Sequence, residues 1–123
     1  MSDEIIGVNP ETARSATTGK TFHPIYVGKY KTLTHSFVKV KSVAGSPTSY
    51  SVTERIENYD PETGLSETIL THTAQTATTG EIKNALDTGK TLSNWIRVKM
   101  VISFVGGTAP TLKFAHTMHL KEN

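Results

Sequence analysis

The histidines are the first residues to consider for metal chemistry. His116 and His119 lie three positions apart in a stretch that alternates like a β-strand. On a strand, this spacing sends the two side chains to opposite faces, so they cannot hold one metal ion together. His116 falls in an apolar row, and we expect it to be buried and hydrogen-bonded. His23, His35 and His72 could converge in space with an acid, but they lack the carboxylate or cysteine spacing of a metal motif. We therefore predict no metal and no cofactor.

Two Gly-Lys-Thr triplets, at residues 19–21 and 89–91, end like a phosphate-binding loop. That loop also needs a glycine five residues before its second glycine, because the intervening backbone must wrap the phosphates. Arg14 and Asn84 occupy those positions. Nucleotide binding is therefore not predicted.

The remaining polar residues show no arrangement typical of an enzyme. No Ser, His and Asp are combined with the glycines of a nucleophile elbow. We expect Glu54 and Glu57 to be solvated or paired with Arg55, and no pair of carboxylates sits in an apolar setting that would shift a pKa. The sequence thus predicts a protein without catalytic activity.

Trp95 is the residue that looks too large for open solvent on the outer side of its predicted strand. It could pack over the stem of Lys121 as a cation–π pair. It could equally anchor an interface or a sugar ring together with Arg97, Lys99 and Lys113. The other candidate interface residues are Ile5, Ile6 and Val8.

Charge is distributed unevenly along the chain, although the net charge is only +2. Residues 50–67 carry five acidic residues against one arginine, and residues 82–123 carry six basic residues against two acidic ones. Opposite patches favour association with a second copy or with a complementary neighbour. A net charge this small gives no argument for direct nucleic-acid binding. No stretch approaches the roughly 20 apolar residues that span a bilayer, and the acidic first residues do not resemble a secretory signal, so no membrane partner is predicted.

Several sequence features predict β structure. The chain has 123 residues, no cysteine and 20 threonines, which suits one threonine-rich domain held by packing alone. Alternating apolar residues at 96–104 and 112–120 predict two strands joined by a glycine-rich loop at 106–110 as an antiparallel hairpin. The expected pairs are Phe104–Leu112, Ile102–Phe114, Met100–His116, Val98–Met118 and Ile96–Leu120. A second layer must cover their common face.

Other segments give weaker signals. Thr32–Val43 is strand-like with a β-bulge expected near residues 36–38. Tyr50–Thr73 is expected to form a hairpin around a turn at residues 61–64, with Ile56 opposite Ile69 and Val52 opposite Thr73, near a sheet edge. Residues 81–86 suggest a short helix or an ordered loop. Residues 1–22 are too poor in apolar groups to order themselves and are interpreted as an extended arm before a domain at 23–123.

The segments Asn94-Trp95-Ile96-Arg97-Val98-Lys99 and Val105-Gly106-Gly107-Thr108-Ala109-Pro110-Thr111-Leu112-Lys113-Phe114 resemble the endings of small β-sandwich virion proteins of tailed bacteriophages, of the capsid decoration or auxiliary type. The resemblance implies a non-enzymatic subunit present in many symmetric copies, without catalytic residues. It also implies a place in the virion after production in the host cytoplasm. The implied partners are the major capsid protein or other virion subunits, and copies of the chain itself as a homo-oligomer.

Together, these observations predict an all-β, jelly-roll-like antiparallel β-sandwich with an extended N-terminal arm. The leading hypothesis is a capsid decoration protein that binds a phage head through its arm and its charged faces. The alternatives are a tail-tube or connector subunit, or a carbohydrate-binding module that uses Trp95.

Overall fold

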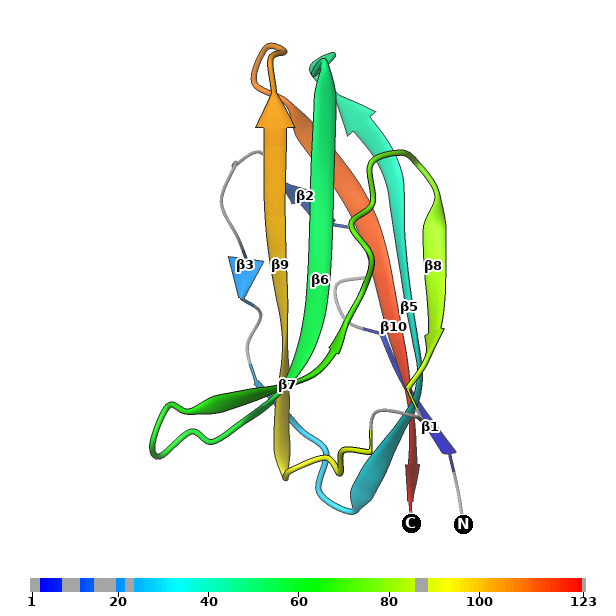
Figure 1. The fold of residues 1–123 in the computed structure, drawn as a ribbon, viewed down its shortest axis with the longest axis vertical. Coiled ribbons are helices and arrows are strands. Elements are labelled where there is room, and N and C mark those ends of the chain that lie inside the picture. Colours follow the sequence, from blue (N-terminus) through cyan, green and yellow to red (C-terminus); the bar gives the residue numbers. More distant parts are fainter. Residues whose placement is uncertain (1–2, 8–11, 15–19, 22–23, 86–88, 123) are drawn as a thin grey trace.

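A computed structural model describes residues 3–7, 12–14, 20–21, 24–85 and 89–122 of the chain. Within these ranges the protein contains ten strands and no helix. The strands form two antiparallel sheets of five strands each, packed face to face (Figure 1). The predicted all-β sandwich is therefore confirmed. No helical segment of the described ranges has the length and hydropathy needed to cross a membrane.

In each sheet, one of the last two strands of the chain lies in the interior of the strand order. In sheet A, β10 lies between β5 and the short strands β1 and β2, and β8 follows β5. The strands of sheet A are β1 (Asp3–Gly7), β2 (Thr12–Arg14), β5 (Tyr30–Ala44), β8 (Gly80–Asn84) and β10 (Thr111–Glu122). In sheet B, β9 lies between β6 and the short strands β3 and β4, and β7 follows β6. The strands of sheet B are β3 (Lys20–Thr21), β4 (Ile25–Tyr26), β6 (Ser49–Tyr59), β7 (Ser66–Thr71) and β9 (Trp95–Val105).

The predicted hairpin between β9 and β10 is wrong, because the two strands belong to different sheets. β9 pairs with β6, placing Ile102 opposite Val52, and β10 pairs with β5, placing Phe114 opposite Val40. The pairs that do not form are Phe104–Leu112, Ile102–Phe114, Met100–His116, Val98–Met118 and Ile96–Leu120. Both rows nevertheless point into the core, as predicted. Alternation fixes the buried face of a strand but does not say which strand lies beside it.

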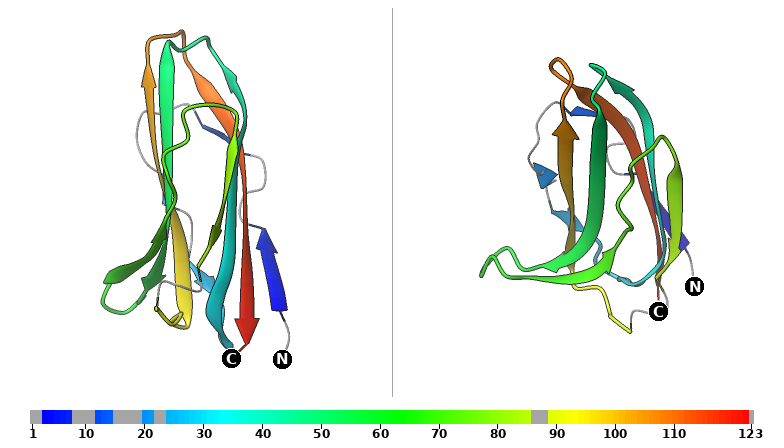
Figure 2. Two further views of the ribbon diagram at one scale, coloured as in Figure 1. Left: turned by 45° about the vertical axis from the view of Figure 1, so that its right-hand side comes forward. Right: turned by 45° about the horizontal axis from the view of Figure 1, so that its top comes forward.

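The loop at 106–110 is an arch that carries the chain from sheet B to sheet A (Figure 2). It packs against the neighbouring arch between β5 and β6: Thr108 N–H donates to the carbonyl of Gly45 at 2.8 Å. Gly107 has a φ of +85°, and a Cβ on it would lie 2.6 Å from the same carbonyl. The glycines are thus required by two stacked crossings and do not indicate a hairpin turn.

β6 and β7 form the predicted hairpin, and Figures 1 and 2 show it projecting from the body of the sandwich. Tyr59 lies opposite Ser66, as the predicted turn requires. A bulge between Ile56 and Glu57 then shifts the register, so Ile56 pairs with Leu70 and not with Ile69. The register is also shifted further along β6, where Val52 bridges to Gln75 and not to the expected Thr73.

Two further predictions need correction. β5 does contain register irregularities, but they fall opposite the steps 113/114, 119/120 and 121/122 of β10, away from residues 36–38. Residues 80–84 form strand β8, antiparallel to β5, where a short helix or loop at 81–86 was expected. Exposure alternates along β8, as expected for an edge strand with one face on the protein.

The N-terminal segment contains the described strands β1, β2 and β3, which pair with β10, β10 and β9 of the same chain. Ile5 and Ile6 lie on β1, opposite His119 and Met118, and Val8 lies outside the described residues. The role of residues 1–22 as an arm stays a prediction.

Candidate functional site

The surface around Trp95 is built by two neighbouring strands of sheet B. Trp95 pairs with Tyr26 in the ladder between β9 and β4, and their rings meet edge to face with centroids 5.3 Å apart. The expected contact with Lys121 is absent because Lys121 lies on β10, in the other sheet. Tyr26 is 62% exposed, so this aromatic pair is open to a ligand or a neighbouring molecule.

Arg97 continues this surface along β9. Its guanidinium lies 4.4 Å from the ring centroid of Tyr59, a cation–π contact, and its Nε donates to Glu57 at 2.9 Å. Arg55 Nε donates to the other oxygen of Glu57 at 3.0 Å. The predicted pairing of Glu57 with Arg55 is therefore confirmed, and a second arginine joins it.

A cleft of about 540 Å³ lies between the Trp95 surface and the turn of the projecting hairpin. Aromatic rings, carboxylates and an amide side chain line it together. The lining residues are Tyr59, Asp60, Pro61, Glu62, Ser93, Asn94 and Trp95. This combination offers flat apolar surfaces and hydrogen-bonding groups side by side, the general requirement of a binding cleft for a polar ring.

The predicted interface residues do not gather on one surface. Trp95, Arg97 and Lys99 alternate along β9 and share the outer face of sheet B. Lys113 is exposed on β10, in sheet A.

A second polar group lies in the middle of the core, where a chain of hydrogen bonds crosses between the sheets. Glu81 Oε1 accepts from His72 Nδ1 at 2.7 Å and from Thr73 N–H at 2.9 Å. His72 Nε2 is then left as an acceptor for the hydroxyl of Ser36 at 2.7 Å, and Ser36 Oγ accepts from His116 Nε2 at 3.1 Å. His116 is thus buried and hydrogen-bonded, as predicted. Glu81 joins the edge of sheet A to the segment that leaves β7 in sheet B.

Glu54 is the unsatisfied member of this buried group. It lies on β6 between Val52 and Ile56 and is 1% exposed, so the expectation of a solvated or Arg55-paired carboxylate near a sheet edge is wrong. Its Oε1 lies 3.0 Å from His116 Nε2, but that nitrogen is aligned with Ser36. Both oxygens of Glu54 and Nδ1 of His116 lack a hydrogen-bond partner among the described residues. An unpaired polar atom in the core is costly.

Burial controls the ionisation of this group. Desolvation raises the pKa of Glu54 well above its usual value and lowers the pKa of His116 to about 3, with repulsion from His72 adding to the second effect. Burial also lowers the pKa of His72, although the carboxylate of Glu81 partly opposes this. For Glu81, burial acts to raise the pKa, but hydrogen bonds from Thr73 and His72 outweigh it and lower the pKa. These shifts favour the neutral form of both imidazoles and the protonated form of Glu54.

The order Ser36–His72–Glu81 matches that of a nucleophile, a base and an orienting acid. Ser36, however, is 0% exposed, so no substrate can approach its hydroxyl in this structure. Within the described ranges, no three His, Cys, Asp or Glu residues are placed to hold a metal ion. His35, which could have joined His72, instead packs near Phe37 and His119, and His23 lies outside the described residues. The polar group therefore belongs to the interior structure of the sandwich.

Sequence reasoning missed Glu54, Ser36 and Glu81 as a group. One signal was available, because alternation places Glu54 in the same row as Val52 and Ile56. No comparable signal exists for Ser36 and Glu81, whose positions depend on the register between β5 and β8.

Neither a protein-family model nor a curated protein sequence matches this chain. Among solved structures, the sandwich is similar to VP2 of the infectious bursal disease virus VP2 subviral particle, with a TM-score of 0.52 and 10% identity over 98% of this chain and 33% of the other. The T=1 particles derived from the same virus give a TM-score of 0.52 with 8% identity, over 98% of this chain and 32% of the other. The chain therefore spans about a third of the length of these viral chains.

The SPBc2 prophage-derived protein YomS also aligns, with 13% identity over 97% of this chain and 96% of YomS. Its TM-score of 0.47 is too low to carry an argument. The likeness to the viral particle proteins establishes the fold, a β-sandwich of a kind found in virus particles.

Proposed function

We propose that this protein is a non-enzymatic structural subunit of a virus particle, and more specifically a capsid decoration or auxiliary protein of a phage head. The observation that carries the proposal is the projecting β6–β7 hairpin (Figure 1). Leu65 follows its turn and is 71% exposed. A projecting hairpin that carries an exposed apolar side chain offers a contact surface to a neighbouring molecule.

The fold and the surface support an assembly role. The similar viral chains come from a subviral particle and from T=1 particles, so this sandwich can serve as a particle building block. Ser36, the nucleophile of the triad-like order, lies sealed between the sheets. Exposed groups instead offer contacts: the Tyr26–Trp95 pair on sheet B and the lysine-bearing face of sheet A. Residues 1–22 are proposed as a docking arm.

The test is co-sedimentation of the purified protein with shells assembled from the major capsid protein encoded in the same genome. We expect the protein to pellet with the shells at a saturating, fixed ratio. Deletion of residues 1–22 should reduce the pelleted fraction, and the far-ultraviolet circular dichroism of the variant shows whether the sandwich remains. No binding of the intact protein to shells would refute the decoration role. Rings or tubes of the protein alone in negative-stain micrographs would favour the tail-tube or connector alternative.

The cleft of about 540 Å³ supports a second candidate, a carbohydrate-binding module. Trp95 and Tyr59 offer ring faces, and Asp60, Glu62 and Asn94 offer groups that can bind hydroxyls. A glycan array should then show binding that Trp95→Ala abolishes and that Val101→Ala, on the same outer face, leaves intact. If no glycan on the array binds, the carbohydrate-binding candidate is refuted and the assembly role is the remaining candidate.

A further inference from the structure

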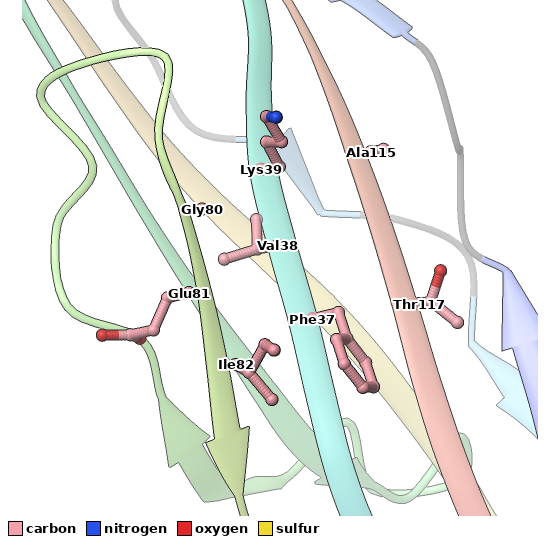
Figure 3. Close-up of a pocket in the computed structure, with 8 residues that line it drawn as sticks. All are labelled: Phe37, Val38, Lys39, Gly80, Glu81, Ile82, Ala115 and Thr117. Carbon is pink, nitrogen blue, oxygen red and sulfur yellow. The ribbon is translucent and has the colours of Figure 1, made fainter.

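The outer face of sheet A carries an apolar groove of about 400 Å³ (Figure 3). Phe37 of β5, Ile82 of β8 and Ala115 of β10 line it, and Ile82 is 66% exposed. Gly80 lies opposite Lys39 in the ladder, and a Cβ there would lie 3.2 Å from the Cβ of Lys39. The missing side chain keeps this end of the groove open.

The charge at the groove is positive. Lys39 is exposed, lines the groove and pairs with Ala115 across the ladder. Lys113 is also exposed and precedes Ala115 by two residues, so it shares the same face. Glu81 also contributes to the lining, but its carboxylate is bound to His72 and Thr73 and points away from Phe37 and Ile82 (Figure 3).

The tip of the β6–β7 hairpin has the opposite character. Leu65 follows the exposed acids Asp60 and Glu62 in the same turn. Asp60 also stiffens the turn, because its carboxylate accepts hydrogen bonds from Thr63 Oγ at 2.8 Å and from the N–H of Glu62 at 3.3 Å. The tip is therefore a rigid, acidic knob with one apolar side chain.

We propose that the hairpin tip of one copy docks into the sheet A groove of a second copy, with Leu65 against Phe37 and Ile82. Asp60 and Glu62 would then face Lys39 and Lys113. The tip projects from sheet B and the groove faces outward from sheet A, so one chain cannot make this contact with itself (Figure 2). A head-to-side contact of this kind repeats from copy to copy and gives rings or open chains. This inference rests on the proposed assembly role, because it names one neighbour of the subunit.

The test is sedimentation velocity of the full chain without shells, at concentrations up to about 1 mM, because a small interface binds weakly. Wild-type protein should associate beyond the dimer. Leu65→Asp removes the apolar side chain of the tip, and Ile82→Asp places a charge in the groove. Each variant alone should therefore be monomeric. An equimolar mixture should form a 1:1 dimer and stop there, because one intact tip and one intact groove remain. Both side chains are exposed, so both variants should keep the wild-type circular dichroism spectrum.

Val101→Asp is the matched control, because Val101 is an exposed apolar residue on sheet B, away from the tip. It should associate like the wild type. Glu62→Lys should weaken association about tenfold, and combining it with Lys39→Glu should restore it. A monomeric wild type, a mixture that stays monomeric, or an Ile82→Asp defect without a Leu65→Asp defect would each overturn the docking. Since shells are absent, such a result leaves the co-sedimentation test of the assembly role untouched.

Discussion

The core of this sandwich has apolar layers above and below a polar layer, and the two kinds of layer are held in different ways. Around Phe114 and Ile102, buried apolar side chains of both sheets form one hydrophobic cluster. In the middle layer, Ser36, His72 and His116 meet through directional hydrogen bonds, and Glu54 is enclosed without any. The apolar layers supply the stability of the fold, whereas the polar layer fixes how the sheets are aligned and costs free energy at Glu54.

The largest effect is expected from truncating a buried side chain in one of the apolar layers. Phe114 is 0% exposed, so Phe114→Ala should lower the free energy of unfolding by about 3–5 kcal/mol through lost burial and the cavity left behind. Urea denaturation measures this difference. Val105→Ala, at an exposed apolar position, should change it by less than about 0.5 kcal/mol. A loss below about 1 kcal/mol for Phe114→Ala would mean that the apolar layers do not dominate.

The polar layer should respond in the opposite direction. Glu54→Met replaces a carboxyl group that has no hydrogen-bond partner by an apolar group of similar length, so we expect the free energy of unfolding to rise by about 1–4 kcal/mol. Glu81→Gln is the control within the same layer. It weakens the hydrogen bonds to His72 and Thr73, so it should destabilise the fold. A destabilised Glu54→Met would show that Glu54 holds a stabilising contact.

The pH dependence of stability should expose the same difference. Below about pH 6.5 the unfolded chain binds protons at His72 and His116 more readily than the folded chain does, so acid destabilises the fold. Glu54 has the opposite effect: from about pH 4.5 upward the unfolded chain releases this proton while the folded chain retains it, so stability falls until the pH passes the raised pKa of Glu54. The histidine effect ends above about pH 6.5, where the unfolded chain has also lost those protons, and any further fall in stability then comes from Glu54.

Urea titrations at a series of pH values measure this profile. Glu54→Gln should remove the decline on the alkaline side and keep the decline on the acidic side. The positive charge of Lys83 helps to lower the pKa of His72. Lys83→Ala should therefore reduce the stability that the protein loses in acid. A flat profile between pH 4.5 and 8 would contradict the assigned protonation states.

The smallest expected effect lies on the surface. Arg97→Lys keeps the positive charge but loses the planar stacking on Tyr59 and the directed bond to Glu57, which should cost about 1 kcal/mol. Thermal denaturation detects such a change. Lys99→Arg, two residues along β9, is the matched control and should be neutral.

The sequence predicts the faces of the long strands better than it predicts their neighbours. Ile96, Met100 and Phe114 point inward as alternation requires, because burial of one face is a local property of a strand. The pairing of β9 with β6, and of β10 with β5, depends on long-range packing, and a glycine-rich loop serves an arch between sheets as well as a hairpin. The turn at 61–64 was predictable because proline and glycine fix its geometry locally.

The candidate sites follow the same division. The outward position of Trp95 follows from alternation, but its partner Tyr26 comes from a distant two-residue strand that has no periodicity of its own. The polar layer joins five strands or strand ends, and a bulge in the β6–β7 ladder shifts the residues that follow it. The residues that form the polar layer therefore cannot be predicted from the sequence of any one segment.

The place of β10 between β5 and β1 has a consequence for synthesis of the chain. The ribosome makes β1 and β5 first, and both must wait for residues 111–122 before either gains its shared neighbour. Until then β5 has only the short β8 beside it, and its open edge can pair with other nascent chains. We therefore expect sheet A to be completed late, with the edge of β5 exposed to other growing chains until then.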